Sequence, residues 1–477
     1  MPEVAHITRF APSPTGSLHL GNARTALFSW LAARASGGRF GLRIDDTDAG
    51  RSQDALLARQ LEELRWFGSS WDEGPGVGGP HEPYRQSERG EFYAKALAQL
   101  EANGQTYPCF CSPEELQLSR KAQLSAGRPP RYARTCAGLT GEEVQRRVAS
   151  GQRPAIRFRV PDHRVVEFHD RIHGPQRFQS DDIGDFVIRR NDGSVSFFLG
   201  NALDDSAMGI TLVLRGDDHL ANTPRQLLLL EALGMAQPEY GHLPLVLAPS
   251  GTPLSKREGA ASLTDLRAQG YLPAAIGNYL LRLGHACGHD GWLAMDQLAS
   301  HFDLARTSHS AARFDEAQLR HWQREAVMHA TDAEIEQWLG SHLDALPAHV
   351  ERGAFVTVVR GNVLLPADVD ELVVVVGHES VPVADDAAAQ ITAAGTEFFT
   401  SAASVFTPNA ADFKAWTRAI AEATGRKGAR LFMPLRSALT GATHGPELAP
   451  LVGLLGADRV LQRLDTARQL AATAQRG

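Results

Sequence analysis

The chain has 477 residues, of which 43% are hydrophobic and 22% charged, with a formal net charge of −7. This length exceeds one domain and suits roughly three to five, each with a substantial core. The acidic balance excludes a protein that coats nucleic acid through its overall charge, but it allows a local basic face that binds RNA.

The cysteines and the apolar runs bear on the compartment. Four cysteines are too few for a disulfide framework in a chain of this length, which indicates a reducing environment. The N-terminal residues lack the anatomy of a signal peptide. The apolar run at 372–376 is too short to span a bilayer. We therefore expect a cytoplasmic protein with no membrane partner.

The start of the chain predicts a strand, a turn and a helix. Residues 4–10 include β-favouring side chains, and the prolines and glycine of 11–16 force a turn. From Asn22 onward, apolar residues recur with helical spacing. His19 and Gly21 therefore fall at a helix N-terminus, where free N–H groups and the helix dipole favour an anion such as a phosphate. An ordinary turn with a surface histidine is the alternative.

Acidic side chains follow the next predicted strand. Residues 1–108 alternate between strand and helix patterns, which is typical of a parallel sheet with crossover helices. The second strand is predicted at 40–44, and Asp45 and Asp48 come directly after it. Ligands of open α/β sheets bind beyond the carboxyl ends of the strands, so we expect these carboxylates and His19 at one cleft. A solvated turn or a helix cap is the alternative.

A cysteine cluster marks the start of a different region. Cys109 and Cys111, with Cys136 further on, suit a tetrahedral zinc site that lacks its fourth ligand. Reduced cysteines in a scaffold that needs no metal would explain the same residues. Strand-rich pieces within 109–195 predict an α+β insertion in the sheet domain.

The sheet pattern resumes after the insertion and then gives way to helices. Residues 210–215 predict a buried strand that ends in charged residues, and 243–247 predict the last strand before a polar loop that contains Lys256. A single lysine in a loop is usually a solvated charge. The segments 1–108 and 196–257 would together form one nucleotide-binding fold.

Several sequence words together resemble the glutamyl-tRNA synthetase family of bacterial type. The H-x-G turn and the L-S-K-R loop are similar to the two nucleotide-binding signatures of class I aminoacyl-tRNA synthetases. The motifs that indicate the glutamyl-tRNA synthetase family within class I are RFAPSPTG at 9–16, LRIDDTD at 42–48, LRGDDH at 214–219, NTPRQ at 222–226, GRKGAR at 425–430 and LFMPLR at 431–436. The resemblance extends along the whole chain.

The resemblance implies a fold and a role for each domain. A Rossmann-like parallel-sheet domain, residues 1–108 and 196–257, would be catalytic. The α+β insertion at 109–195 would hold the acceptor end of tRNA. The helical segment at 258–322 would brace the tRNA stem, and an all-α region at 323–477 would bind the anticodon.

The implied reaction has two steps. Glutamate attacks the α-phosphate of ATP to give glutamyl-adenylate, and the terminal adenosine of tRNA then takes the glutamyl group. Neither step needs a protein nucleophile, so catalysis would consist of positioning and charge stabilisation. The implied partners are tRNA, glutamate and ATP, with Mg²⁺ held mainly by phosphates and water and zinc at the cysteines. The resemblance also implies a monomer.

The resemblance assigns roles to individual residues. The implied catalytic residues are Lys256 and His19. The implied ATP-binding residues are His19, Gly21, Asn22, Asp218, Ser255, Lys256 and Arg257. The implied glutamate-binding residues are Arg9, Ser13, Asp45, Phe197, Asn201 and Arg215. The implied tRNA-binding residues are Asp48, Arg360, Arg426, Lys427 and Arg436. The implied zinc ligands are Cys109, Cys111, Tyr132 and Cys136. Because the arginine fork matches a carboxylate, we assign the side-chain carboxylate of glutamate to Arg215 and its ammonium to Asp45.

The chain departs from the family pattern at four positions. The family normally has glutamate at Asp45, tyrosine at Phe197 and lysine at Pro253, and some members have a zinc-binding histidine at Gly138. The missing hydroxyl at Phe197 is worth roughly 1 kcal/mol. These changes suggest a diverged copy, one of two in its cell. They leave open whether it charges tRNA(Glu) or tRNA(Gln), and whether it binds tRNA or adenylate without aminoacylating.

Overall fold

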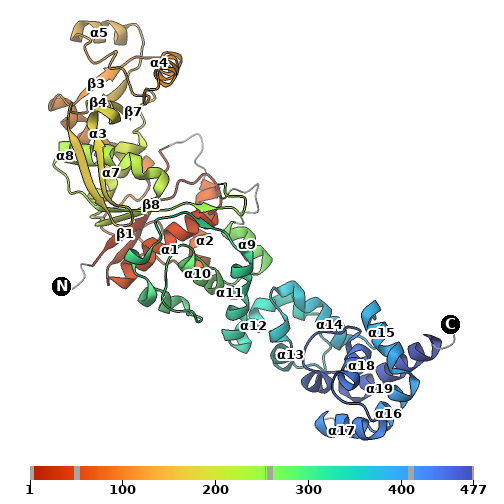
Figure 1. Ribbon diagram of the computed structural model, residues 1–477. Coiled ribbons are helices and arrows are strands. Elements are labelled where there is room, and N and C mark those ends of the chain that lie inside the picture. The colour runs from red at the N-terminus through yellow and green to blue at the C-terminus, as the bar shows by residue number, and fades with distance from the viewer. Residues whose placement is uncertain (1–4, 48–53, 253, 255–261, 407–412, 475–477) are drawn as a thin grey trace. The chain divides into compact units, whose positions relative to one another are not determined.

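The computed structural model describes residues 5–47, 54–252, 254, 262–406 and 413–474. The chain divides into two compact units. The first comprises Met1–Arg267 and Ile276–Leu319, and the second comprises Ala268–Ala275 and Arg320–Gly477. Figure 1 shows strands and helices in the first unit and helices in the second.

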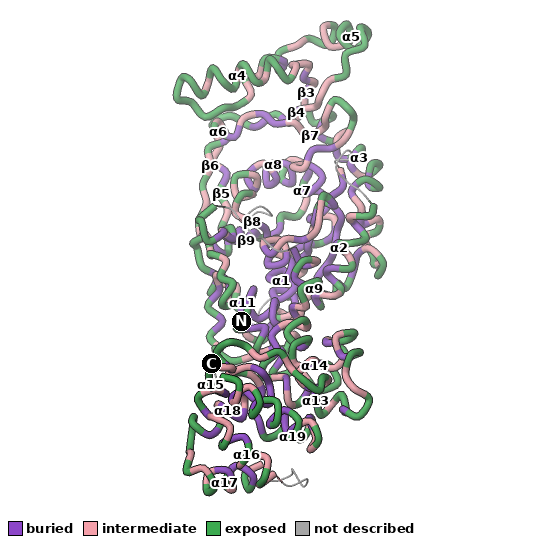
Figure 2. Tube along the Cα trace, turned by 90° about the vertical axis from the view of Figure 1, so that its right-hand side faces the viewer, coloured by how far each residue is buried: buried purple, intermediate pink, exposed green. Residues whose placement is uncertain are grey.

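The first unit begins with the predicted strand, turn and helix. Strands β1 (Ile7–Phe10) and β2 (Arg39–Leu42) pair in parallel, and α1 (Leu20–Ala35) connects them. Helix α1 is buried along most of its length, as Figure 2 shows. Because a helix that crosses between parallel strands packs on the sheet, its inward residues are apolar. This confirms the interpretation of the first 40 residues.

The larger sheet of the first unit has the order β6-β5-β9-β8. Strands β8 (Leu212–Gly216) and β9 (Glu239–Leu243) are parallel and joined by α8 (Thr223–Leu233). The hairpin β5 (Val165–Asp170) and β6 (Gly174–Gln179) adds to the free edge of β9, with β5 parallel to β9. A backbone hydrogen bond of 2.9 Å from Thr211 to Ile7 places the start of β8 beside β1.

Two boundaries differ from those predicted. The hairpin β5–β6 lies within 109–195 in sequence but belongs to the larger sheet, so the insertion is not a separate body. The strand predicted at 243–247 is interrupted by Pro244, which has no N–H to donate to a neighbouring strand. Strand β9 ends before it, and β10 (Val246–Leu247) pairs instead with β11 (Ala312–Arg313).

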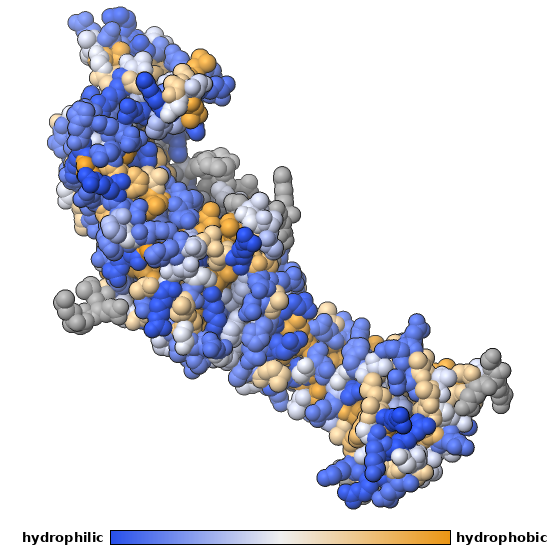
Figure 3. Space-filling view, viewed as in Figure 1, coloured by the Kyte–Doolittle hydropathy of each residue, from blue (hydrophilic) through white to orange (hydrophobic). Residues whose placement is uncertain are grey.

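The insertion contributes a second, antiparallel sheet. Its strands are β3 (Thr106–Cys109), β4 (Ala155–Phe158) and β7 (Phe186–Arg189), in that order. Helices α4 (Pro113–Ser125) and α5 (Gly141–Ala149) each begin with a capping box and have no buried residue. The exposed leucines of α4 add apolar surface there, as Figure 3 shows.

The described residues up to 320 also include five further α-helices. They are α2 (Asp54–Phe67), α3 (Gly90–Ala102), α6 (Ser180–Ile183), α7 (Phe197–Ala207) and α9 (Leu263–Gln269). Helices α10 (Pro273–Arg282) and α11 (Glu316–His329) each extend across a boundary between the two units. Because α11 is continuous across 322, the predicted boundary at 322–323 falls inside a helix.

The second unit is helical throughout its described residues. Its remaining helices are α12 (Asp332–Leu339), α13 (Arg352–Val359), α14 (Val369–Gly377), α15 (Asp385–Ala394), α16 (Thr396–Ser404), α17 (Phe413–Thr424), α18 (Ala429–Thr440) and α19 (Leu448–Ala474). One apolar core that includes Phe355, Phe398 and Leu464 joins them. Among the described helices of the chain, none is long and apolar enough to cross a membrane.

A buried arginine ties the helices of this unit together. Arg463 on α19 is 2% exposed and donates to the backbone oxygens of Leu439, Val375 and His378. These carbonyls lie at the C-terminal ends of α18 and α14, where a cation is favourable. Burial lowers the pKa of Arg463 to about 10.

We expect Arg463→Met to lower the free energy of unfolding by about 2–4 kcal/mol, because the buried carbonyls lose their donors while the side-chain volume is nearly kept. The matched control is Arg468→Met on the same helix, which removes an exposed pair with Asp465 and should cost less than about 1 kcal/mol. Urea unfolding followed by tryptophan fluorescence measures both. Equal effects of the two variants would contradict this role of Arg463.

Candidate active site

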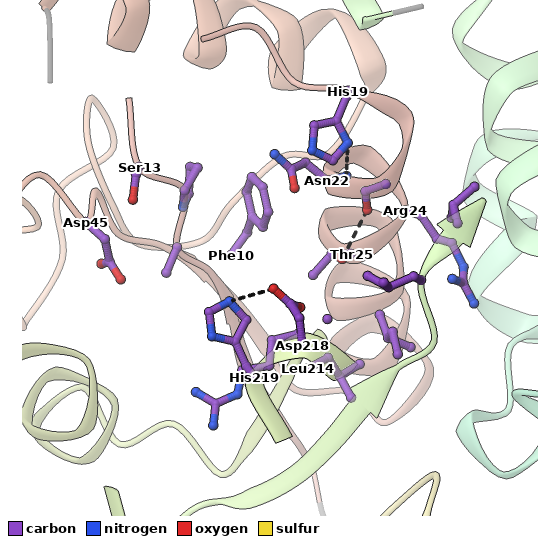
Figure 4. Close-up of a pocket in the computed structure, with 18 of the residues that line it drawn as sticks. Phe10, Ser13, His19, Asn22, Arg24, Thr25, Asp45, Leu214, Asp218 and His219 are labelled. Carbon is purple, nitrogen blue, oxygen red and sulfur yellow. Dashed lines mark hydrogen bonds and ion pairs between the residues drawn. The ribbon is translucent and has the colours of Figure 1, made fainter. Parts of the chain in front are cut away.

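A cavity of about 580 Å³ opens where β1, β8 and the N-terminus of α1 meet. Figure 4 shows His19 and Asn22 at the start of α1, with Asp45, Asp218 and His219 on the other walls. All described residues that the sequence assigned to ATP or glutamate line it. They are Arg9, Ser13, His19, Gly21, Asn22, Asp45, Phe197, Asn201, Arg215 and Asp218. Segments separated by about 200 residues or more thus share one cavity.

The turn before α1 presents hydrogen-bond donors to this cavity. His19 is the N-cap of α1, and its Nδ1 accepts the backbone N–H of Asn22 at 3.3 Å. In the neutral imidazole the proton is then on Nε2, which becomes a donor. A Cβ on Gly21 would lie 3.1 Å from the His19 ring, so a larger residue would displace the imidazole. The turn therefore combines an imidazole donor with a helix N-terminus, which suits a phosphate.

The predicted lysine loop lies partly outside the described residues. Ser255, Lys256 and Arg257 are not described, and neither is Pro253. The described residues on either side of 255–261 are anchored at the cavity. Leu254 lines it and donates to Val246, and Ser262 forms a β-bridge with His19.

Arg215 reaches the cavity from the end of β8. It is 6% exposed, and its Nε and Nη2 donate to His242 Nε2 at 3.1 Å and to Thr223 Oγ1 at 2.8 Å. Its Nη1 is buried and has no hydrogen-bond partner in the described part of the chain. Burial lowers the pKa of Arg215 to about 10, which still leaves it charged at neutral pH. A buried cation in this state is complementary to an incoming carboxylate.

Arg9 and Asp45 line the same cavity but are already bound within a buried ion network. Arg9 contacts Asp205 through Nε at 2.9 Å and Nη2 at 3.1 Å. Arg43 lies between Asp45, at 2.7 Å, and Asp205, at 2.6 Å. Asp45 also accepts from Asn201 at 2.6 Å. We predict that Arg9 and Asp45 bind the substrate directly, and this stays a prediction: both line the cavity, and both also have strong protein partners.

The network also includes Asp204, the residue that precedes Asp205 on α7. Asp204 accepts from Arg89 at 2.7 Å, from Gln86 at 2.8 Å and from Tyr93 at 2.7 Å. Sequence reasoning missed Asp204 and Asp205, although two consecutive aspartates in an otherwise apolar helix were a readable signal. Buried carboxylates require partners, and such a pair predicts arginines nearby.

Two more residues of the cavity wall were missed. Arg24 on α1 is 2% exposed and donates to the backbone oxygen of Pro244 at 2.7 Å. Its Nε and Nη2 have no partner among the described atoms, and burial lowers its pKa to about 10. His219 lies 5.2 Å from the ring of Phe197, centre to centre, and burial lowers the pKa of His219.

The cysteine cluster forms in the insertion. The sulfur atoms of Cys109, Cys111 and Cys136 lie within 4.8 Å of one another, and the Tyr132 hydroxyl is 3.4 Å from two of them. Burial raises the pKa of the Cys109 thiol, but hydrogen bonds with Arg157 and Tyr132 outweigh burial and leave this pKa lowered. Zn–S bonds of about 2.3 Å in a tetrahedron separate two sulfurs by about 3.8 Å. The Cys111–Cys136 distance of 3.6 Å is similar, so the donor set fits zinc.

The predicted tRNA contacts have differing surroundings. Arg360 pairs with an aspartate of α12. Arg426 and Arg436 each donate to a backbone carbonyl, at 2.7 and 2.8 Å. Lys427 is exposed, and Asp48 lies outside the described residues. The three arginines therefore have structural partners within the second unit.

Comparison with known proteins decides the family. Residues 6–321 match the family described as tRNA synthetases class I (E and Q), catalytic domain, and residues 384–468 match an anticodon binding domain. Glutamate–tRNA ligase 1 of Halorhodospira halophila is 53% identical over 99% of this chain and 98% of that protein. Glutamate–tRNA ligase 2 of Alkalilimnicola ehrlichii is 51% identical over 98% of each chain. The chain belongs to the glutamate–tRNA ligase family.

Solved structures agree with this assignment. A glutamate–tRNA ligase from Elizabethkingia meningosepticum, in complex with its amino acid, is 29% identical with a TM-score of 0.87 and covers 98% of this chain and 99% of that chain. The glutamyl-tRNA synthetase of Elizabethkingia anophelis has the same identity and TM-score. The Rossmann-like catalytic domain and the helical C-terminal part predicted from the sequence are confirmed.

We expect Asp205→Asn to lower the free energy of unfolding by about 3–5 kcal/mol, because it leaves Arg9 and Arg43 short of a buried charge. Burial raises the pKa of Asp205, but Arg9 and Arg43 outweigh burial and lower it. The unfolded state therefore takes up this proton first as the pH falls, so the stabilisation is present above the ordinary carboxyl pKa and is lost below it.

The difference between wild type and Asp205→Asn should accordingly stay nearly constant from pH 7 down to the ordinary carboxyl pKa, and shrink as the pH falls below it towards the lowered pKa of the folded state. Glu231→Gln is the control, because its ion pair with Arg164 is half exposed and should contribute less than about 1 kcal/mol. Urea unfolding at a series of pH values measures all three proteins. A difference that stays constant with pH would contradict the lowered pKa.

Proposed function

We propose that this chain ligates glutamate to the 3′ end of tRNA, using ATP and passing through glutamyl-adenylate. The observation that carries this proposal is a single cavity with a helix N-terminus on one wall and the Arg215 guanidinium on another, whose Nη1 has no hydrogen-bond partner among the described residues. The first wall suits a phosphate chain and the second suits a carboxylate. The choice of glutamate as the amino acid and of tRNA as the nucleic acid is supported by the similarity to glutamate–tRNA ligases.

In the first step the chain orients two substrates without a covalent enzyme intermediate. His19, Gly21 and Asn22 bind the phosphates of ATP, and Lys256 neutralises the charge that develops on the β- and γ-phosphates. Arg215 holds the side-chain carboxylate of glutamate. Mg²⁺ accompanies ATP and is held mainly by phosphates and water. The gain in rate comes from proximity and from charges that are already in place.

In the second step the 2′-hydroxyl of the terminal adenosine takes the glutamyl group. The insertion holds the acceptor end, residues 258–322 brace the stem, and residues 323–477 bind the anticodon. The match of 384–468 to an anticodon binding domain supports the last assignment. Lys427 is the exposed cation that we assign to the RNA backbone there. The protein acts as a monomer in the cytoplasm, where its substrates are.

Zinc binds the insertion through Cys109, Cys111, Cys136 and the Tyr132 hydroxyl. The support for this is the closeness of the three sulfurs and the position of the phenol oxygen beside two of them. Four ligands from protein side chains leave no open position, which is typical of structural zinc rather than catalytic zinc. These residues would fix the loops that lead into α4 and α5.

Charging of purified tRNA(Glu) and tRNA(Gln), with glutamate and glutamine each offered, tests the proposal. We expect glutamate to be attached and glutamine to be rejected, because an uncharged amide does not satisfy Arg215. Attachment to one tRNA or to both identifies the cognate partner. Failure to charge either tRNA, together with absence of pyrophosphate exchange, would instead indicate a protein that binds tRNA or adenylate.

We expect Lys256→Met to lower kcat of charging by about 10²–10³-fold, as for other single electrostatic donors. Because Lys256 acts on charge that develops in the transition state, the KM for glutamate should change by less than about threefold. Arg267→Met is the control, since it removes an exposed pair with Glu62 and should leave kcat unchanged. A large rise in KM with unchanged kcat would contradict the role of Lys256.

The zinc assignment predicts about one equivalent of zinc per chain in the purified protein, measured by atomic absorption. Cys136→Ser should lose most of it, and Tyr132→Phe should hold it more weakly against a chelator, because one of four ligands is removed. Cys287→Ser is the control, since this buried cysteine is not part of the cluster. Zinc-free wild-type protein that charges tRNA at full rate would show reduced cysteines without metal.

A further inference from the structure

A chain of hydrogen bonds crosses three neighbouring strands of the larger sheet and ends at the cavity. It runs from Asp170 on β5 through His242 on β9 to Arg215 on β8. His242 is the register partner of Arg215 in the parallel pair β8–β9, and Asp170 is the residue at which β5 pairs with β9. Asp170 and His242 have no exposed surface, and of the three residues Arg215 lines the cavity.

The direction of each hydrogen bond follows from Arg215. Its Nε is always a donor, so Nε2 of His242, at 3.1 Å, must accept. The imidazole proton is then on Nδ1, which donates to Asp170 Oδ2 at 2.5 Å. Burial, the largest influence, lowers the pKa of His242 and keeps the ring neutral. The backbone N–H groups of Ile172 and His173 donate to the other oxygen of Asp170 and fix the carboxylate.

A comparison with Arg9, another arginine of the cavity, shows why a neutral ring lies next to Arg215. Arg9 binds Asp205 directly through two nitrogens, so its charge is paired within the protein. Arg215 is oriented by two neutral acceptors, His242 and Thr223, and forms no ion pair with any described carboxylate. A carboxylate in place of His242 would orient Arg215 equally well, but it would compete with the carboxylate of a substrate.

We propose that His242 and Asp170 are positioning residues for the recognition of glutamate. His242 accepts from Nε of Arg215 and so orients the guanidinium, and Asp170 determines the tautomer of His242. Nη1 of Arg215, which has no hydrogen-bond partner among the described residues, is then available to a carboxylate in the cavity. Neither residue touches the substrate. This inference rests on the proposed function, in which Arg215 binds the side-chain carboxylate of glutamate.

The variants separate orientation from general stability. His242→Leu removes the acceptor, and we expect the KM for glutamate to rise about 10- to 100-fold, the range for hydrogen bonds that involve a charged group. The KM for ATP should change by less than about twofold. His242→Gln can supply an amide oxygen to Arg215 Nε and should recover most of the loss. Pyrophosphate exchange in the presence of tRNA measures both constants.

Asp170→Asn tests the tautomer. Its amide oxygen would keep the two backbone donors, which turns the amide nitrogen towards His242 Nδ1. The ring would then carry its proton on Nε2 and face Arg215 Nε with a second donor. We expect the KM for glutamate to rise at least about tenfold, with kcat at saturating glutamate within about threefold. The same exchange assay measures this.

Leu212→Ala is the matched control, because this buried residue of β8 is outside the hydrogen-bonded chain. It should lower stability but leave the KM for glutamate within about twofold. Equal changes in the KM for glutamate and for ATP, or an unchanged KM for glutamate in both His242→Leu and Asp170→Asn, would overturn the inference while exchange by the wild type upholds the proposed function. Absence of glutamate-dependent exchange in the wild type would overturn the proposed function and this inference with it.

A measurement on the wild type keeps the proposal testable where His242→Leu or Asp170→Asn does not fold. In ¹⁵N-histidine spectra, His242 should show the neutral tautomer with its proton on Nδ1, and the signal is assigned by its loss in His242→Gln. A proton on Nε2 would overturn the inference, because that nitrogen could not accept from Arg215.

Discussion

The buried ion network is the constraint on which the first unit depends. It joins β1 through Arg9, the end of β2 through Arg43 and Asp45, and α7 through Asp204 and Asp205. Arg89, at the start of α3, adds a third guanidinium, so that three positive and three negative groups balance formally. Removing any one of them would strand a charge away from water. Segments from distant parts of the sequence must therefore keep fixed positions relative to one another. Two members of the network, Arg9 and Asp45, also line the cavity.

Arg215 differs from the charged residues of the network, because their positive and negative charges are paired with one another. Arg9 and Asp45 face the cavity, but their charges are paired by Asp205 and by Arg43. Arg215 faces the same space with neutral hydrogen-bond partners, and it forms no ion pair with a carboxylate of the described residues. Holding a buried cation in this way costs free energy in the empty protein. In the function we propose, a ligand carboxylate would restore that free energy on binding, so that charge, and not only shape, would be the basis of selection.

The parts that were predictable from the sequence are those set by local chemistry. Two prolines, a glycine and helical apolar spacing determine the turn at His19, and the cysteine spacing determines the cluster at Cys109. Pro244 also indicates the end of β9, because proline has no N–H to donate. Our prediction of a strand at 243–247 did not take this into account. The pairing of Arg43 with Asp205 was not predictable, since it depends on the register between remote segments. Likewise, no local pattern indicates that β5 pairs with β9 rather than with the strands of the insertion.

The two departures in the pocket acquire a physical meaning from this arrangement. Asp45 has a shorter side chain than the glutamate that the family resemblance implies, and its carboxylate is held by Arg43 and Asn201 at the wall. Phe197 lacks a hydroxyl, and its ring packs 5.2 Å from that of His219. This side of the cavity therefore offers fewer hydrogen bonds and a less polar surface. Because a charge interaction strengthens as its surroundings become less polar, the contact that we propose between Arg215 and a glutamate carboxylate would gain in weight where the hydroxyl is missing.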